Sequence, residues 1–309
     1  MENVDFIDAV SPFRELAAYE ALWDKKDTTV KKISDLFSQY FYESNADNYK
    51  KIFTIFKNND FNFSSLVDEK VIGCYKEKLK PFIFKYNFNI SMFFEPEFPC
   101  ALLDSFLPIY LLYYMGNFAL LNKKAISVVG TRMPTEEGVR RTEKLVRKLC
   151  EDEYVIVSGL ARGIDTAAHK TAIATNGSTI AVIGTPINKC YPPENTKLQQ
   201  EIAKEHLLIS QVPFLKYESQ DFRKNRFFFP ERNKIMSSIS EATIIVEAGE
   251  TSGSLIQARD ALKKGKKVFI LNSCFENKAI TWPERLNNLG AIRVREYEEI
   301  KQELNKNNG

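Results

Sequence analysis

The chain has 309 residues, enough for two domains and a sizeable core, and its 43 basic and 40 acidic side chains leave a formal net charge of only +3. This balance means that net charge by itself does not indicate a nucleic-acid binder. The five cysteines show no paired spacing, and the N-terminus has no signal-peptide pattern. We therefore expect a cytoplasmic protein with reduced thiols and no metal site.

Residues 1–95 predict a mainly helical region. Ser11-Pro12 and Thr29 each form a typical helix start ahead of apolar residues at helical spacing. From Tyr40 to Phe94 the sequence is rich in Phe and Tyr mixed with Lys and Asn, a composition that can form a stacking platform for single-stranded nucleic acid. We favour the alternative that these aromatic residues form the core of a small helical domain, and they indicate no function for it.

The most apolar window of the chain runs from Leu102 to Leu121. Asp104, Pro108 and the pair Gly116-Asn117 interrupt it, so it does not form a continuous membrane-spanning helix. We expect a buried segment that leads into the second domain.

Residues 96–300 alternate between β-branched apolar runs and stretches with helical spacing. The expected strands are 125–129, 154–158, 178–183, 206–210, 242–247 and 267–271, and the expected helices lie near 134–150, 163–175, 195–204, 229–239 and 253–264. Strands separated by helices imply right-handed crossovers, so we predict an α/β fold with a doubly wound, mostly parallel sheet. A short helix near 283–288, a strand at 291–293 and a helix from Glu296 follow, and residues 301–309 form a polar C-terminal tail.

Three of the predicted strands end in turns rich in glycine and hydroxyl groups. These turns begin at Gly130, Ser158 and Glu247, and each precedes a predicted helix. Glycine lets the backbone approach a ligand closely, and the amides at a helix N-terminus bind anions. The carboxyl ends of parallel strands share one edge of the sheet, where open α/β sheets bind ligands. Together the three turns predict a phosphate-binding rim.

The segment 216–234 carries six basic and three acidic side chains around Arg226-Phe227-Phe228-Phe229. Phenylalanines between cations offer stacking faces together with phosphate partners. The alternative is a solvated charge run whose phenylalanines turn inward, and a helix starting at Pro230 needs at least one such anchor. We expect one of Phe227 and Phe228 to face a binding groove.

A series of short motifs lies in order along residues 98–295. They are Phe98-Pro99, Gly130-Thr131-Arg132, Ser158-Gly159-Leu160-Ala161-Arg162-Gly163-Ile164-Asp165, Ala181-Val182-Ile183-Gly184-Thr185, Tyr191-Pro192-Pro193-Glu194-Asn195, Phe229-Pro230-Glu231-Arg232-Asn233-Lys234 and Glu247 through Leu255. Together these motifs resemble those of the DNA-processing protein A (DprA/Smf) family. No single motif would be specific, but their order over roughly two thirds of the chain is.

The resemblance implies a Rossmann-like domain that binds and protects single-stranded DNA and loads the RecA recombinase onto it in natural transformation and recombination. It further implies a homodimer active in competence, without catalytic activity or cofactor. It places Arg132 at a DNA phosphate and Arg226 where the family often has a lysine. The expected DNA- and phosphate-binding residues are Gly130, Arg132, Ser158, Gly159, Arg162, Gly163, Asn195, Lys197, Arg226, Phe228, Arg232, Asn233, Lys234, Ser252, Gly253 and Ser254.

The chain also departs from the family pattern. Thr196 and Lys197 follow Asn195 where a more basic pair is usual, and Lys234 replaces a common arginine. Residues 1–95 do not plainly match the family's small helical domain, and no winged-helix domain is expected after the last helix.

Two other function classes share this kind of fold. Nucleotide phosphoribohydrolases carry a Pro-Gly-Gly-x-Gly-Thr turn, whereas the turn from Glu247 here lacks the paired glycines. Asp165 and His169 are one helical turn apart, as acid–base pairs can be, but we expect Asp165 to cap its turn and His169 to pack. A small-nucleotide-binding sensor that uses the same rim is the other alternative.

Overall fold

The computed structural model describes residues 12–42, 62–103 and 108–306. The chain forms two compact units, of which unit 1 comprises residues 1–113 and 211–225 and unit 2 comprises residues 114–210 and 226–309. Residues 211–225 thus group with the N-terminal part of the chain, which the sequence did not indicate. The sequence analysis placed domain boundaries at residues 95 and 300. These two domain boundaries stay predictions.

Unit 1 is mainly helical around an aromatic core. Its elements are α2 (Pro12–Asp24), α3 (Val30–Tyr42), the 3-10 helix η1 (Phe63–Leu66), α5 (Glu69–Lys85), β1 (Asn89–Met92), α6 (Cys100–Leu103), the first half of β2 (Leu111–Gly116), α10 (Phe214–Ser219) and α11 (Phe222–Asn225). Phe63 is fully buried and packs edge-on against Phe37 and Phe93, with 5.5 Å between ring centroids in each pair. The described aromatic residues therefore confirm the core interpretation, while much of the predicted platform, residues 43–61, lies outside the described residues.

A buried carboxyl group on α2 forms hydrogen bonds with the segment 211–225. Glu20 accepts hydrogen bonds from the Tyr113 hydroxyl at 2.6 Å and from the backbone N–H groups of Phe214 at 2.8 Å and Leu215 at 3.1 Å. Burial raises the pKa of Glu20 to about 7, although the three donors favour its charged form. Residues 211–225 are therefore an integral part of unit 1.

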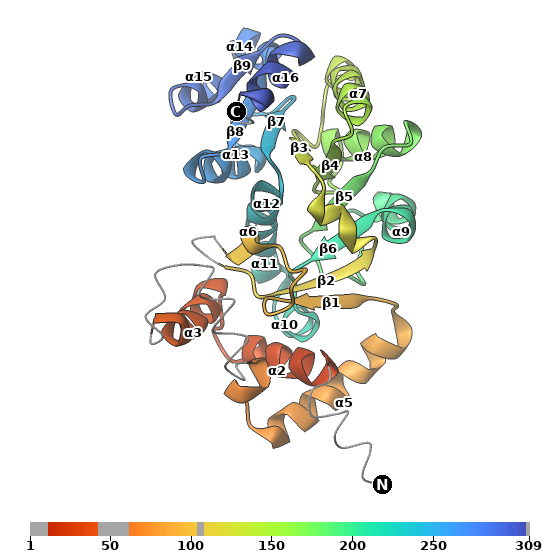
Figure 1. The fold of residues 1–309 in the computed structure, drawn as a ribbon, viewed down its shortest axis with the longest axis vertical. Coiled ribbons are helices and arrows are strands. Elements are labelled where there is room, and N and C mark those ends of the chain that lie inside the picture. The colour runs from red at the N-terminus through yellow and green to blue at the C-terminus, as the bar shows by residue number, and fades with distance from the viewer. Residues whose placement is uncertain (1–11, 43–61, 104–107, 307–309) are drawn as a thin grey trace. The chain divides into compact units, whose positions relative to one another are not determined.

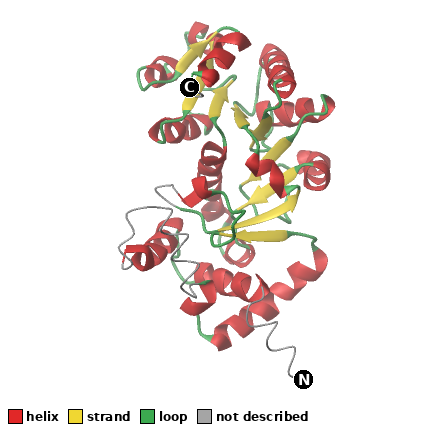
Figure 2. Cartoon of the chain, in the orientation of Figure 1, coloured by secondary structure: helices red, strands yellow, loops and turns green. Residues whose placement is uncertain are grey.

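Unit 2 alternates strands and helices, as Figure 2 shows in yellow and red. Its elements are η2 (Phe118–Asn122), β3 (Ala125–Val129), α7 (Glu136–Glu151), β4 (Val155–Ser158), α8 (Ile164–Ala174), β5 (Thr179–Ile183), η3 (Pro193–Asn195), α9 (Thr196–Glu205), β6 (Leu207–Ser210), α12 (Phe228–Ile239), β7 (Ala242–Ile245), α13 (Ser254–Lys263), β8 (Lys267–Leu271), α14 (Asn272–Glu276), α15 (Trp282–Asn287), β9 (Ile292–Val294) and α16 (Tyr297–Asn305). Each predicted strand and helix of this region is present, with ends within a few residues of those expected. The predicted polar tail was partly wrong, because residues 301–305 continue α16 and the buried Leu304 holds its last turn on the core. Residues 307–309 of that tail lie outside the described residues.

The strands form one sheet in the order β1-β2-β6-β5-β4-β3-β7-β8-β9, and the pairs from β6 to β9 are all parallel. Side chains from α7, α8 and α16 share a buried cluster with the strands on one face, including Val146, Ala168 and Ile300. In Figure 1, α7, α8 and α9 lie on one side of the strands and α12 and α13 on the other. The predicted doubly wound α/β fold is therefore confirmed.

The strand order reverses between β3 and β7, because β4 follows β3 on one side while β7 adds on the other. The turns after these two strands are joined, since the Thr131 N–H donates to the Glu247 carbonyl at 2.7 Å. The Ile164 N–H at the start of α8 donates to the Thr131 carbonyl at 3.2 Å. Three strand ends thus meet at the position where open α/β sheets bind ligands. None of the helices described is both long and apolar enough to cross a membrane.

Candidate nucleic-acid interface

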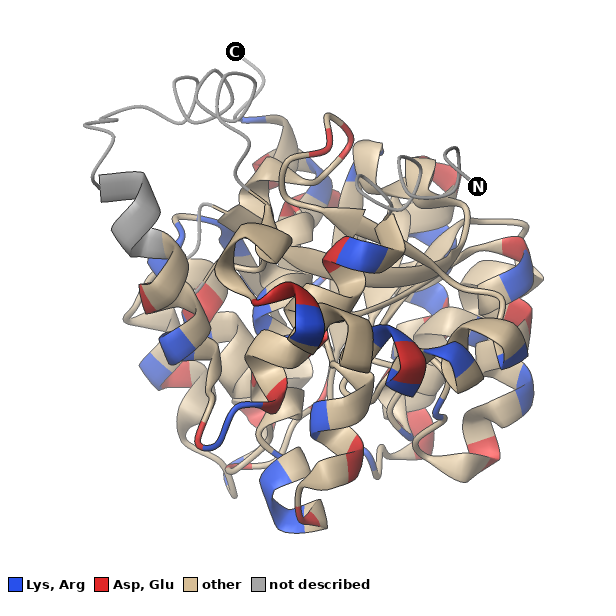
Figure 3. Cartoon of the chain, turned by 90° about the horizontal axis from the view of Figure 1, so that it is seen from below, with Lys and Arg blue, Asp and Glu red and all other residues tan. Residues whose placement is uncertain are grey.

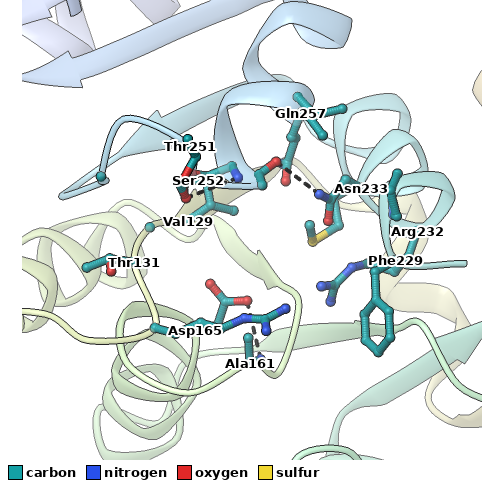
Figure 4. A pocket seen from close by; sticks show the side chains of 18 residues that line it. Val129, Thr131, Ala161, Asp165, Phe229, Arg232, Asn233, Thr251, Ser252 and Gln257 are labelled. Atoms are coloured by element: carbon teal, nitrogen blue, oxygen red, sulfur yellow. Dashed lines mark hydrogen bonds between the residues drawn. The ribbon is translucent and has the colours of Figure 1, made fainter. Parts of the chain in front are cut away.

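A cavity of about 490 Å³ opens at the reversal point between β3 and β7. Its wall combines residues after β3 and β7 with residues from α8 and α12, among them Gly130, Arg132, Asp165, Arg232 and Asn233. In the view of Figure 4, Gln257 and Asn233 lie on one side and Asp165 and Ala161 on the other. We call this space the switch-point cavity.

Arg232 is a buried, charged side chain in the wall of the switch-point cavity. Its side chain is 5% exposed, and its Nη1 donates to the carbonyls of Gly159 and of Val182, the latter at 2.7 Å. Burial lowers the pKa of Arg232 to about 10, and attraction to Asp165 opposes this shift. Burial also raises the pKa of the Asp165 carboxyl, with Arg232 acting in the opposite direction. Each group therefore favours the charged form of the other, which burial disfavours.

Gly159 makes room for this guanidinium rather than for a ligand. A Cβ atom on Gly159 would lie 2.0 Å from Arg232 Nη1. Gly163, at φ +74°, faces the backbone of the turn after β3, because a Cβ atom there would lie 2.4 Å from the Thr131 carbonyl oxygen. The glycines of this turn thus serve close contacts within the protein.

The N-terminus of α13 faces the switch-point cavity. Gly253 precedes the helix without a side-chain cap, and only Asn233 Nδ2, at 3.8 Å, would lie near an added Cβ atom there. Ser252 and Ser254 line the same opening, with 2.8 Å between their hydroxyl oxygens. The amides of a helix N-terminus carry partial positive charge, so this edge suits an anion.

Arg132 adds an exposed cation at the rim of the cavity. Its charge also helps to lower the pKa of Arg232. In Figure 3, ribbon segments of Lys and Arg are interspersed with segments of Asp and Glu.

Several predicted site residues have their side chains engaged away from the cavity. The Ser158 hydroxyl is fully buried and donates to the Val128 carbonyl at 2.7 Å, and Asn195 Nδ2 donates to the Leu160 carbonyl at 2.9 Å. Arg162 is exposed and pairs with Glu194. Lys234 pairs with Glu231 at 2.8 Å, and Lys197 is exposed on α9 without lining the cavity.

The three phenylalanines before and within α12 point in different directions. Phe227 is 75% exposed, whereas Phe228 is only 6% exposed. Phe228 turns inward because it begins the face of α12 that continues through Arg232 and Ile235 at helical spacing, so it has no free ring for a base. Phe229 lines the cavity and contacts the Tyr191 ring at 5.5 Å between centroids. The exposed ring near Arg226 is therefore that of Phe227.

The two groups considered for acid–base work have structural partners. Asp165 accepts a hydrogen bond from the Ala161 N–H at 3.3 Å, as a turn cap does. His169 is fully buried with its Nδ1 at 2.7 Å from Thr179 Oγ1, and burial lowers its pKa to about 3. Glu247 accepts from the backbone N–H and the hydroxyl of Thr135, which fixes the start of α7. No cluster of three His, Cys, Asp or Glu side chains suited to a metal ion occurs within residues 12–42, 62–103 and 108–306.

Sequence reasoning missed Gln257 and Phe229 as cavity residues. The signal for Gln257 was its place in the first turn of the helix that follows Gly253, three residues after Ser254. Phe229 was treated as part of a motif, without a direction for its ring.

Comparison with known proteins agrees with this architecture. A family model described as DNA recombination-mediator protein A matches residues 89–305. The chain belongs to this family. It is 34% identical over 240 residues to the DNA processing protein DprA of Bacillus subtilis, an alignment that spans 77% of this chain and 76% of that protein.

Two solved structures of family members superpose well. DNA processing protein A from Streptococcus pneumoniae matches with a TM-score of 0.70 at 29% identity, covering 94% of this chain and 97% of that one. The Helicobacter pylori protein, described for its unique single-stranded DNA binding mode, matches with a TM-score of 0.62 at 29% identity over 72% of this chain and 98% of that one. The family resemblance inferred from the motifs is thus confirmed.

Proposed function

We propose that this chain binds single-stranded DNA as a recombination mediator, with the backbone of the strand at the switch-point cavity. The observation that carries the proposal is the meeting of Arg132 and the N-terminus of α13 at the switch-point cavity. The exposed ring of Phe227 comes directly before α12, which lines the same cavity with Arg232 and Asn233. Cations and helix N-termini bind phosphates, and an exposed aromatic ring stacks on a base. Membership of the family and the likeness to the H. pylori protein support it.

The same features favour a single strand over a duplex. Stacking on Phe227 requires an unpaired base, because the faces of paired bases are covered by their neighbours. The formal net charge of +3 supplies little of the general attraction on which duplex binding depends.

The finer parts of the proposal rest on family membership. They are protection of the strand, loading of the RecA recombinase onto it in natural transformation, and action as a homodimer without catalysis. The turn from Glu247 supports a binding role, since that carboxylate is committed to Thr135.

The direct test compares single- and double-stranded oligonucleotides of one sequence in a titration with this protein. The single strand is expected to bind much more tightly. Equal affinity for both forms would contradict the proposal, and tight binding of a free mononucleotide with weak binding of either DNA would favour the small-nucleotide sensor.

Replacing Arg132 by alanine is expected to weaken single-strand binding without unfolding the protein, because Arg132 is exposed at the rim. Loss of one phosphate contact flattens the log–log salt dependence by about 0.7. Titrations at several salt concentrations measure this slope. Arg140→Ala is the matched control, since Arg140 is exposed on α7 outside the cavity. An Arg132 variant with unchanged affinity and slope would remove this residue from the site.

Replacing Phe227 by alanine is expected to weaken binding to mixed-sequence single strands by about 1 to 3 kcal/mol, the worth of one stacked base. The salt slope stays unchanged because no phosphate contact is lost. Leu289→Ala serves as a control for loss of an exposed apolar side chain, since Leu289 is 63% exposed. Equal binding by the Phe227 and Leu289 variants would reject stacking at this position.

A further inference from the structure

The loop between β5 and α9 presents an exposed aromatic ring beside the switch-point cavity. We call residues 184–195 the tyrosine loop. Tyr191 of this loop is 44% exposed and does not line the cavity. Its ring lies 5.5 Å, between centroids, from the ring of Phe229, which does line the cavity. Tyr191 therefore continues the aromatic wall by one ring beyond the cavity.

The two rings are held in place by their surroundings. Gly184 leaves space for the Phe229 ring, because a Cβ atom on Gly184 would lie 2.7 Å from Phe229 Cδ1. Within the tyrosine loop, Thr185 Oγ1 donates to the Lys189 carbonyl at 2.9 Å, and Gln199 Nε2 of α9 donates to the same carbonyl at 3.2 Å. A ring that is positioned in advance loses little freedom on binding, so this pair is suited to stacking.

An exposed cation lies next to Tyr191. Asn195 Nδ2 donates to the Leu160 carbonyl at 2.9 Å, which joins the tyrosine loop to the turn after β4. Arg162 of that turn pairs with Glu194. The pKa of Arg162 is raised, first by Glu194 and to a smaller degree by Tyr191. The ring, the guanidinium and the carboxylate therefore lie together at one place.

The ring and the guanidinium together match one nucleotide. Successive bases of a single strand stack on neighbouring aromatic side chains, and arginine binds a phosphate through two charge-assisted hydrogen bonds. A carboxylate offers arginine the same pair of acceptor oxygens, so Glu194 stands where a phosphate would bind. The side chains of Arg162 and Glu194 are 61% and 47% exposed, and an exposed ion pair is weak enough to be exchanged for a phosphate.

We infer that Tyr191 and Arg162 form a second nucleotide subsite outside the switch-point cavity, where the ring stacks on a base, the guanidinium binds the adjacent phosphate and Glu194 occupies the phosphate position until the strand binds. This inference rests on the proposed single-strand binding. It makes affinity depend on strand length, because only a strand that extends beyond Phe229 reaches the second subsite. It also makes Glu194 inhibitory, since its carboxylate competes with the strand.

The first test titrates wild-type protein and Tyr191→Ala with thymidine homopolymers of about 4 to 16 nucleotides, the range of single-strand site sizes. The affinity of the variant for the longest strands is expected to fall about tenfold through the loss of one stacked base, while the shortest strands bind as before. The salt slope stays unchanged because no phosphate contact is lost. Tyr191→Phe keeps the ring and is expected to restore the affinity for long strands.

The second test uses Glu194→Gln, which keeps the size of the side chain and removes its charge. Affinity for long strands is expected to rise about threefold, because the competing ion pair is lost. The log–log salt slope steepens by up to about 0.7, since Arg162 becomes free to bind a phosphate. Glu205→Gln is the matched control, because Glu205 pairs with Lys204 on α9 and its replacement changes the net charge equally. The double variant Arg162→Ala/Glu194→Gln is expected to lose the gain.

The outcomes separate the two proposals. An equal loss of affinity at every length in Tyr191→Ala would show that Tyr191 only supports Phe229, and unchanged affinity at every length would show that it does not contact the strand. Either result would overturn the second subsite. An equal gain in the Glu194 and Glu205 variants would also overturn it, since net charge alone would then explain the effect. Failure of the wild type to bind any strand would overturn the proposed function itself.

Discussion

Replacing Arg232 by methionine is expected to lower the free energy of unfolding of unit 2 by about 3 to 5 kcal/mol. The substitution removes a positive charge that favours the ionised form of the buried Asp165 carboxyl, and it removes the donor to the carbonyls of Gly159 and Val182. For a unit of this size the loss corresponds to a decrease of about 6 to 20 °C in melting temperature, which calorimetry measures. Single-strand binding falls as well, because the cavity wall loses its charged centre.

Lys234→Met is the matched control on the same helix. Lys234 pairs with Glu231, and about a quarter of its side chain is exposed, at 26%. Such a pair contributes at most about 1 kcal/mol, so this variant is expected to melt close to the wild type. Equal melting of the two variants would show that the buried Arg232 side chain does not stabilise unit 2.

Replacing Gly163 by valine is expected to destabilise the protein by about 2 to 6 kcal/mol. Gly163 has φ +74°, a conformation that valine strongly disfavours, and the new Cβ atom would overlap the Thr131 carbonyl at 2.4 Å. That carbonyl cannot move freely because it accepts from the Ile164 N–H. Denaturant titration measures the loss, and the displaced turn also carries Arg132, so DNA affinity decreases.

Gly253→Ala tests whether the effect belongs to this particular glycine. Gly253 has φ −62° and ψ −23°, and an added Cβ atom meets only Asn233 Nδ2 at 3.8 Å. The free energy of unfolding of the Gly253→Ala variant is expected to differ from that of the wild type by no more than about 0.5 kcal/mol. A native-like stability of Gly163→Val with lost DNA binding would instead place a phosphate directly at Gly163.

The sequence predicted the α/β unit well because its signals are local. Val155-Ile156-Val157 is continuous and β-branched, as a strand covered on both faces requires. Among the helices, α7 begins at the cap Thr135 and α13 ends just before Gly265. The grouping of residues 211–225 with unit 1 was not predicted. It depends on a hydrogen bond to Glu20, which lies nearly two hundred residues earlier in the chain.

The candidate site was predicted at the level of strand ends but not of individual side chains. In a sequence, a glycine that leaves space for a phosphate looks the same as a glycine that leaves space for a guanidinium group. Gly159 therefore did not indicate that Arg232 fills the space beside it. The direction of each phenylalanine side chain depends on the residue at which α12 begins. Because α12 begins at Phe228, Phe228 is buried and Phe227 is exposed. Gln257 was missed because an unsatisfied amide is visible only once its surroundings are known.

The chain passes between the two units three times, at residues 113/114, 210/211 and 225/226. A fragment that ends at residue 113 would therefore leave Glu20 without the backbone donors of Phe214 and Leu215. Conversely, a fragment that begins at residue 114 would carry Phe214, fully buried in the intact chain, on a segment without its packing partners. Exchange of unit 1 between family members thus requires the transfer of two separate stretches of sequence, residues 1–113 and residues 211–225.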